Sequence, residues 1–187
     1  MRSSFGMLVA RGLIGAGIAA HGAQKAFGSF DGPGPENTAA MMRRLGFDEG
    51  ERAATAASYA EMISGGLIAA GLFGPVGPAL LISTMIVAME SVHIDNGFFV
   101  SKNGVELPML YATAALAFAA GGYGECSLDK LIGAHGFFEK RPWFYAALLG
   151  SVAGAVWVLS QRLPPVPEAA PAQQPQSTGA ETDRTNA

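Results

Sequence analysis

The segment "GGLIAAGLFGPVGPALLISTMIVAME" (Gly65–Glu90) decides the fold of this chain. Two apolar runs flank the short sequence "GPVGP" (Gly74–Pro78), where prolines stop one helix and start the next. The segment therefore predicts two antiparallel helices joined by a tight hairpin. A helix of a soluble protein shows a polar stripe with a period of about 3.6 residues, and neither run has one. We therefore expect the hairpin to lie in lipid.

Apolar stretches recur along the chain, and about 20 residues are needed to cross a bilayer. Five stretches stand out, over about 5–27, 56–73, 75 or 78 to 94, 107–123 and 143–159. They predict an all-α protein, a transmembrane four-helix bundle with an additional fifth C-terminal transmembrane helix. The expected organisation is a four-helix membrane domain, an extra helix and a disordered Pro/Ala/Gln-rich tail, over 1–133, 134–163 and 164–187 respectively.

The composition supports a membrane protein. Half of the 187 residues are hydrophobic and 14% are charged, against about 25% in soluble domains. The net charge is -3 and no basic run is interleaved with aromatic residues, which excludes a nucleic-acid partner. The single cysteine, Cys126, cannot form an internal disulfide, so redox chemistry would need a bound cofactor or a partner protein.

The polar connection between the first two apolar stretches contains one amphipathic segment. This segment, "ENTAAMMRRLGF" (Glu36–Phe47), has an apolar face of methionine and leucine side chains. It predicts a short helix on the membrane surface, with Asn37 as its N-terminal cap.

Because five successive helices would cross the membrane in alternating directions, each loop is assigned to one of the two membrane faces. The N-terminus, the Gly74–Pro78 hairpin and the loop 124–142 share what we call face one. The first long loop, the loop 95–106 and the C-terminal tail share face two. The basic, aromatic flank "EKRPW" (Glu139–Trp143) favours face one as the cytoplasmic side.

Ionisable residues from four predicted helices fall near face two. They are His21, Lys25, Glu61, Glu90, His93 and Glu106. Each charge in the apolar zone costs a few kcal/mol unless it is paired or hydrated. We therefore expect a polar cluster in which Lys25 pairs with Glu61 or Glu106, the alternative being side chains that extend separately to water. Arg11 lies nearer face one, where an interfacial anchor or a contact with lipid phosphate is one interpretation.

Several motifs resemble one known family. "VHIDNGFFVSKNGVELPMLYATAALAFAAGGYGECSLDKLIG" (Val92–Gly133) has a His before "NGFF", a G-x-E opening the fourth helix, and a Gly-rich end running into "SLD". Together with "HGAQKAFG" (His21–Gly28) and "YAEMISGGLIAAGLFGP" (Tyr59–Pro75), it resembles the DoxX family of small bacterial membrane proteins. The resemblance covers about residues 8–133. The fifth helix and the tail extend beyond it, and Glu125 and Cys126 stand where the family more often has a basic or aromatic residue.

The resemblance implies a multi-pass protein of the bacterial inner (plasma) membrane that is linked to membrane redox systems. Some relatives form part of thiosulfate:quinone oxidoreductases, and others are associated with superoxide dismutase and a thiol-handling sulfurtransferase. The implied partners are the lipid bilayer and soluble redox enzymes.

One hypothesis for the function is a redox subunit that meets quinone near face two. His93 and Glu61 would exchange protons with the quinone, Lys25 would hold their charge state, and a partner would supply electrons.

A metal or haem site is less favoured than a quinone site. Four-helix carboxylate proteins use two single glutamates and two Glu-x-x-His pairs. This chain offers Glu61, Glu106 and the single pair Glu90-x-x-His93, or else His21 and His93 for a haem. A third class of hypothesis is a membrane scaffold for a redox complex, a small-solute permease or a purely structural protein. The sequence leaves open whether the chain is an enzyme.

Overall fold

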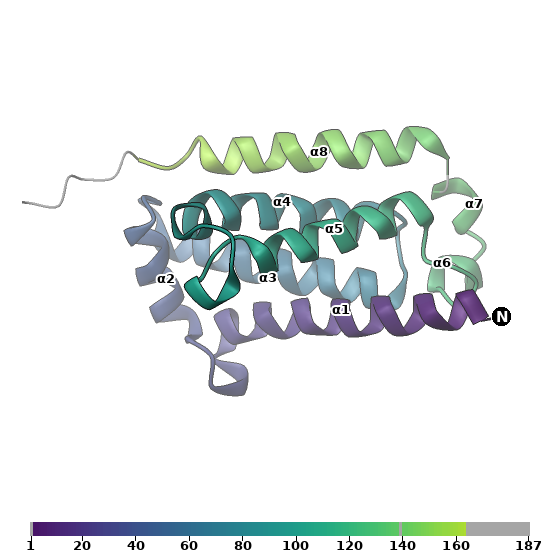
Figure 1. Ribbon diagram of the computed structural model, residues 1–187, viewed down its shortest axis with the longest axis horizontal. Coiled ribbons are helices and arrows are strands. Elements are labelled where there is room, and N and C mark those ends of the chain that lie inside the picture. Colours follow the sequence, from purple (N-terminus) through teal and green to yellow (C-terminus); the bar gives the residue numbers. More distant parts are fainter. Residues whose placement is uncertain (1, 139, 164–187) are drawn as a thin grey trace, which may run out of the picture.

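The computed structural model describes residues 2–138 and 140–163 (Figure 1). The described residues form helices, turns and one isolated β-bridge, with no strands. The long helices are α1 (Arg2–Phe27), α3 (Gly50–Ala70), α4 (Val76–Ala88), α5 (Glu106–Gly121) and α8 (Arg141–Leu159). The predicted all-α architecture, four helices and a fifth, is confirmed. The tail 164–187, predicted to be disordered, lies outside the described residues.

Shorter elements connect the long helices. They are α2 (Gly34–Arg44), α6 (Leu128–Leu131) and α7 (His135–Phe138). The chain also continues helically beyond α4, through a π-helical turn (Met89–His93) and a 3₁₀ turn (Ile94–Asn96).

The helices pack in chain order. α1 lies on α3, α3 on α4, and α4 on both α5 and α8, with α8 on the outside of the bundle (Figure 1). The N-terminus, α6 and α7 lie at one end, which corresponds to face one. α2 lies across the other end, which corresponds to face two.

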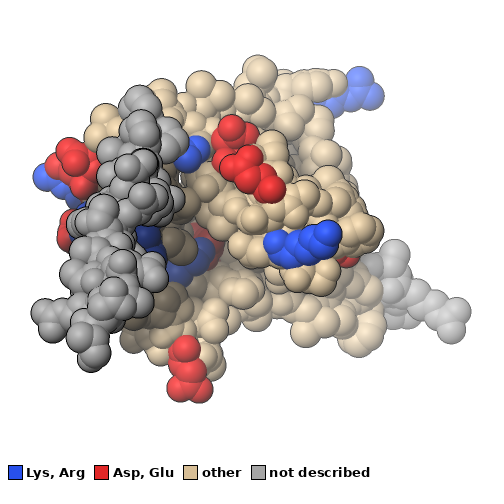
Figure 2. Space-filling view, turned by 60° about the vertical axis from the view of Figure 1, so that its left-hand side comes forward, with Lys and Arg blue, Asp and Glu red and all other residues tan. Residues whose placement is uncertain are grey.

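Three helical stretches in the described part of the chain are long and apolar enough to cross a membrane: 4–27, 76–96 and 141–159. α5 is shorter and equally apolar, while α3 carries a glutamate at its centre. Large apolar side chains are exposed along α1 and α8, for example Leu13, Leu149 and Trp157. Exposed apolar surface of this extent is typical of a lipid-facing surface. Figure 2 likewise shows charged side chains as isolated groups on a largely uncharged surface.

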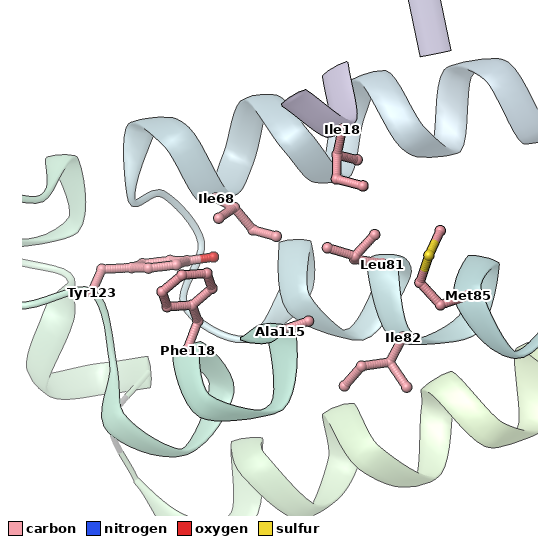
Figure 3. Packing of buried hydrophobic residues seen from close by; sticks show 8 residues of the cluster. All are labelled: Ile18, Ile68, Leu81, Ile82, Met85, Ala115, Phe118 and Tyr123. Carbon is pink, nitrogen blue, oxygen red and sulfur yellow. The ribbon is translucent and has the colours of Figure 1, made fainter. Parts of the chain in front are cut away.

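The core lies between the four bundle helices. Its members share deep burial and come from α1, α3, α4, α5 and the segment after α5 (Figure 3): Ile18, Ile68, Leu81, Ile82, Met85, Ala115, Phe118 and Tyr123. Each helix therefore contributes to one continuous apolar core.

Glycines allow α1 and α3 to approach closely. A Cβ atom on Gly15 would lie 2.5 Å from the Gly65 carbonyl oxygen, and one on Gly22 would lie 2.5 Å from that of Ser58. Small residues at such crossings let helix backbones meet. Gly12, earlier on α1, does not take part in this contact, because a Cβ on it would meet nothing within 4 Å.

Arg11 joins α1 to the C-terminal end of α3. Its side chain is only 2% exposed, and it donates hydrogen bonds to the carbonyls of Ile68 and Ala69 and to the carbonyl of Cys126. The last carbonyls of a helix lack partners within it and carry the negative end of its dipole, which a cation complements. Arg11 is therefore buried inside the protein, and the interfacial or lipid contact suggested by its position is not what the structure shows.

Asp129 closes the same end of the bundle. It is 3% exposed, and its carboxylate accepts hydrogen bonds from the backbone N–H groups of Phe73, at 2.9 Å, and Gly74, at 2.6 Å. Its own N–H donates to the carbonyl of Gly71 at 3.0 Å. α6 therefore holds the hairpin between α3 and α4.

The surface helix α2 begins earlier than the sequence suggests. Gly34 is its first residue, and the Asn37 side-chain amide donates to the carbonyl of Pro33, at 2.8 Å, inside the first turn. Asn37 is therefore not the N-terminal cap. The buried Thr38 hydroxyl similarly donates to the carbonyl of Gly34 at 2.7 Å.

The end of α8 is tied to the turn after α2. The Leu163 N–H donates to the carbonyl of Gly46 at 2.8 Å, and Arg162 Nε donates to the carbonyl of Leu45 at 2.9 Å. Midway along the helix, Gly154 lies close to Ser83 of α4. The fifth helix is therefore packed on the bundle along its length.

The close approach of α1 and α3 predicts the effect of two neighbouring substitutions. Gly65→Ala places a methyl group against the backbone of Gly15 and Ala19 and should lower the free energy of unfolding by about 2 kcal/mol. Gly66→Ala is the matched control because its Cβ meets nothing within 4 Å; it should leave stability unchanged or raise it by up to about 1 kcal/mol. Denaturant unfolding in mild detergent measures the free energy of unfolding of both variants. Equal effects of the two substitutions would contradict the close packing of α1 on α3 at Gly65.

The hydrogen bonds of Arg11 predict that replacing this residue destabilises the protein and loosens the loop that contains Cys126. Arg11→Gln removes a charged donor from three carbonyls and should lower the free energy of unfolding by about 3 kcal/mol. Hydrogen exchange of the amides between Cys126 and Ile132 should accelerate, because the loop loses its link to α1. Arg44→Gln, which removes an exposed cation of α2, should change stability by less than about 0.5 kcal/mol. Unaltered loop exchange in Arg11→Gln would show that Arg11 does not hold the loop.

Candidate functional site

An ion pair links α1 and α3 near face two. Lys25 Nζ lies 2.5 Å from Glu61 Oε1, and the two side chains are 26% and 8% exposed. The contact of Gly22 with Ser58 brings the two helices together one turn before Lys25 on α1, so the lysine reaches the carboxylate. A buried charge is stable in an apolar bundle only when it is paired in this way.

Glu61 keeps one oxygen free. Its Oε2 atom is buried and has no hydrogen-bond partner among the described residues. A buried polar atom without a partner is uncommon and needs an explanation, such as a water, an ion or a ligand group. The carboxylate therefore has one oxygen held by Lys25 and a second that can accept a hydrogen bond.

A cavity adjoins this ion pair. Its volume is about 570 Å³, and it lies between the end of α1, α2 and the first half of α3. Lys25 lines it, as do Ser58, Tyr59 and the exposed ion pair formed by Arg43 and Glu51. Lys25 therefore connects a buried carboxylate with an accessible cavity of mixed polar and apolar lining at the end of the bundle.

His93 ends the π-helical turn that follows α4. Such turns often occur at functional sites because they redirect side chains. His93 Nδ1 lies 2.7 Å from the carbonyl oxygen of Asn103. A carbonyl only accepts, so Nδ1 is assigned as the donor, and Nε2 is the acceptor of the neutral ring.

Glu106, the first residue of α5, binds the segment between His93 and α5, which also contains Asn103. Its Oε2 accepts a hydrogen bond from the Val100 N–H at 2.8 Å. His93 and Glu106 therefore both bind backbone groups of the segment between them, rather than each other or Lys25.

The two remaining residues of the predicted cluster are more exposed. His21 is exposed, and its ring meets the ring of Tyr111 edge-on, with centroids 6.4 Å apart. Glu90 is also exposed and lines a groove at the end of α8 together with Arg162. The structure thus brings Lys25 and Glu61 together, and it places the other four at separate positions toward the same face. Among the described residues, no group of three or more His, Cys, Asp or Glu lies close enough to hold a metal ion.

The opposite end of the bundle contains polar residues that the sequence analysis did not select as site residues. Asp129 and Ser127 stand in the "SLD" motif, and both are buried. Ser127 caps α6 by accepting from the Lys130 N–H at 3.2 Å. A serine followed two residues later by an acid is a signal of a helix start, which could have indicated α6.

Comparisons with known proteins agree with the fold. Residues 6–94 match the family model of DoxX, a stretch that runs from α1 to the end of the π-helical turn and includes Lys25, Glu61 and His93. An uncharacterized protein of Haemophilus influenzae is 40% identical over 60 residues, which are 32% of this chain and 38% of the relative. The chain therefore matches well under half of that relative's length. No solved structure matches the chain.

The family match covers the helices that carry the buried ion pair, and the long apolar helices of the structure are those expected of a membrane bundle. The chain is thus an integral membrane protein whose residues 6–94 are a DoxX domain.

Proposed function

We propose that the chain is a membrane subunit or scaffold of a redox system in the bacterial plasma membrane. In this proposal it holds a quinone near face two, and the Lys25–Glu61 pair is the hydrogen-bonding site. The observation that carries the proposal is the buried Glu61 carboxylate, which has one oxygen paired with Lys25 and the other without a partner.

The free oxygen suits a ligand that gains and loses protons. When Glu61 is ionised, Oε2 accepts a hydrogen bond from a quinol hydroxyl, and when it is protonated it donates one to a quinone carbonyl. Lys25 pairs with the other oxygen of the carboxylate and leaves Oε2 available for either bond.

His93 is proposed as a second proton-exchanging group. The bond from its Nδ1 to the Asn103 carbonyl leaves Nε2 free to take up a proton at the same end of the bundle. The chain has a single cysteine and so no dithiol of its own, and the electrons are proposed to come from a soluble redox enzyme. The resemblance to DoxX proteins of quinone-linked systems supports this assignment.

Quinone retention tests the proposal. The full chain is purified in mild detergent, bound quinone is extracted and quantified per mole of protein, and co-purifying proteins are identified by mass spectrometry. Glu61→Gln should retain about tenfold less quinone, because it loses a charged hydrogen-bonding group. Glu49→Gln is the matched control: it removes a glutamate at the start of the same helix from an exposed ion pair with Arg52, outside the cavity lining, and should retain the wild-type amount.

Equal quinone retention in Glu61→Gln and the wild type, with the helical content of both intact, would contradict the proposal. Solute flux through liposomes that contain the chain alone, in the absence of bound quinone, would instead favour the small-solute permease.

A further inference from the structure

A second cavity lies at face one, on the far side of the bundle from Glu61. Its volume is about 580 Å³, and it is enclosed by the α3–α4 hairpin, the end of α5, α7 and the start of α8. Aromatic rings and basic side chains line it beside small residues, among them Phe118, Phe138, Phe144, Tyr145, Lys140 and Arg141. The cavity thus combines apolar walls with a cationic edge.

His135 adds a hydrogen-bond donor to this lining. Lys130 Nζ lies 3.3 Å from His135 Nε2, and an ammonium group can only donate. Nε2 is therefore the acceptor, and in the neutral ring Nδ1 carries the proton. The Nδ1 atom is buried and has no partner among the described residues. A buried N–H group without a partner is uncommon and calls for an acceptor such as a water or a ligand group.

The charge balance among the described lining residues favours an anion. The acid in the lining is Asp129, and its carboxylate already accepts hydrogen bonds from the backbone N–H groups of Phe73 and Gly74. The Lys140 ammonium instead lies 5.7 Å from the ring centroid of Phe137, and both Lys140 and Arg141 are exposed. Neither cation forms an ion pair with another described residue.

We propose that this cavity binds the phosphate group of an anionic phospholipid. Phosphate oxygens accept from guanidinium, ammonium and imidazole N–H groups, and arginine binds them through two parallel hydrogen bonds. The cavity opens where α8 begins, and α8 is one of the membrane-crossing helices, so the site lies at headgroup depth. Basic residues at this depth attract anionic lipids, and the aromatic walls contact the apolar part of the molecule.

Lipid titration of the full chain tests this site. The protein in mild detergent is titrated with phosphatidylglycerol, with phosphatidylcholine or with inorganic phosphate, and the bound species are counted by native mass spectrometry. Phosphatidylglycerol should bind more tightly than phosphatidylcholine. The double variant Lys140→Gln/Arg141→Gln should weaken phosphatidylglycerol binding about 25-fold, because each basic residue near a membrane surface contributes about fivefold.

The matched control is Arg43→Gln/Arg44→Gln, which removes two adjacent cations at face two and should leave binding at this site unchanged. His135→Phe preserves the charge and removes the buried donor, and it should also weaken binding. An equal loss in both double variants, or no preference for phosphatidylglycerol in the wild type, would overturn the proposal. Binding of inorganic phosphate that depends on Lys140 and Arg141 would support a phosphate site and assign it to a free anion.

Discussion

The structure depends on how two cations of α1 are satisfied inside an apolar bundle. Arg11 binds the last carbonyls of α3, and Lys25 binds Glu61 at the centre of α3. Between these two contacts, Gly15 and Gly22 bring the backbones together. Because a charge without a partner is costly in an apolar environment, the two contacts fix the antiparallel register of α1 and α3. The remaining helices then pack on this pair.

The sequence predicted the architecture because membrane helices carry a strong signal. Apolar runs of nearly bilayer length, separated by the prolines of Gly74–Pro78, leave little choice of topology. It also offered Glu61 or Glu106 as the partner of Lys25, since few acids were available at that depth. The sequence did not predict that Arg11 lies inside the protein. Its partners are backbone carbonyls, which every residue carries, so the pattern of side chains does not identify them.

The candidate site was harder to predict than the fold. The depth of a residue in the membrane follows from its position along a helix. Its contacts also depend on how each helix is rotated about its own axis and on hydrogen bonds to the local backbone. His93 and Glu106 lie at the expected end, yet each binds the backbone of the loop between them. The family match includes α1 and α3, where Lys25 and Glu61 meet, and it ends at residue 94, before α5 and α8.

A double-mutant cycle between Lys25 and Glu61 tests the central claim most directly. Denaturant unfolding in mild detergent is measured for the wild type, Lys25→Met, Glu61→Gln and the double variant. Lys25→Met should cost about 3 kcal/mol, because it leaves the buried Glu61 carboxylate without a partner, and Glu61→Gln should cost less, because Lys25 is partly exposed and lines the cavity. The double change should cost about 2 kcal/mol less than the sum of the two singles. Additive effects would mean that the two side chains do not interact, which would contradict the account of both the α1–α3 register and the site.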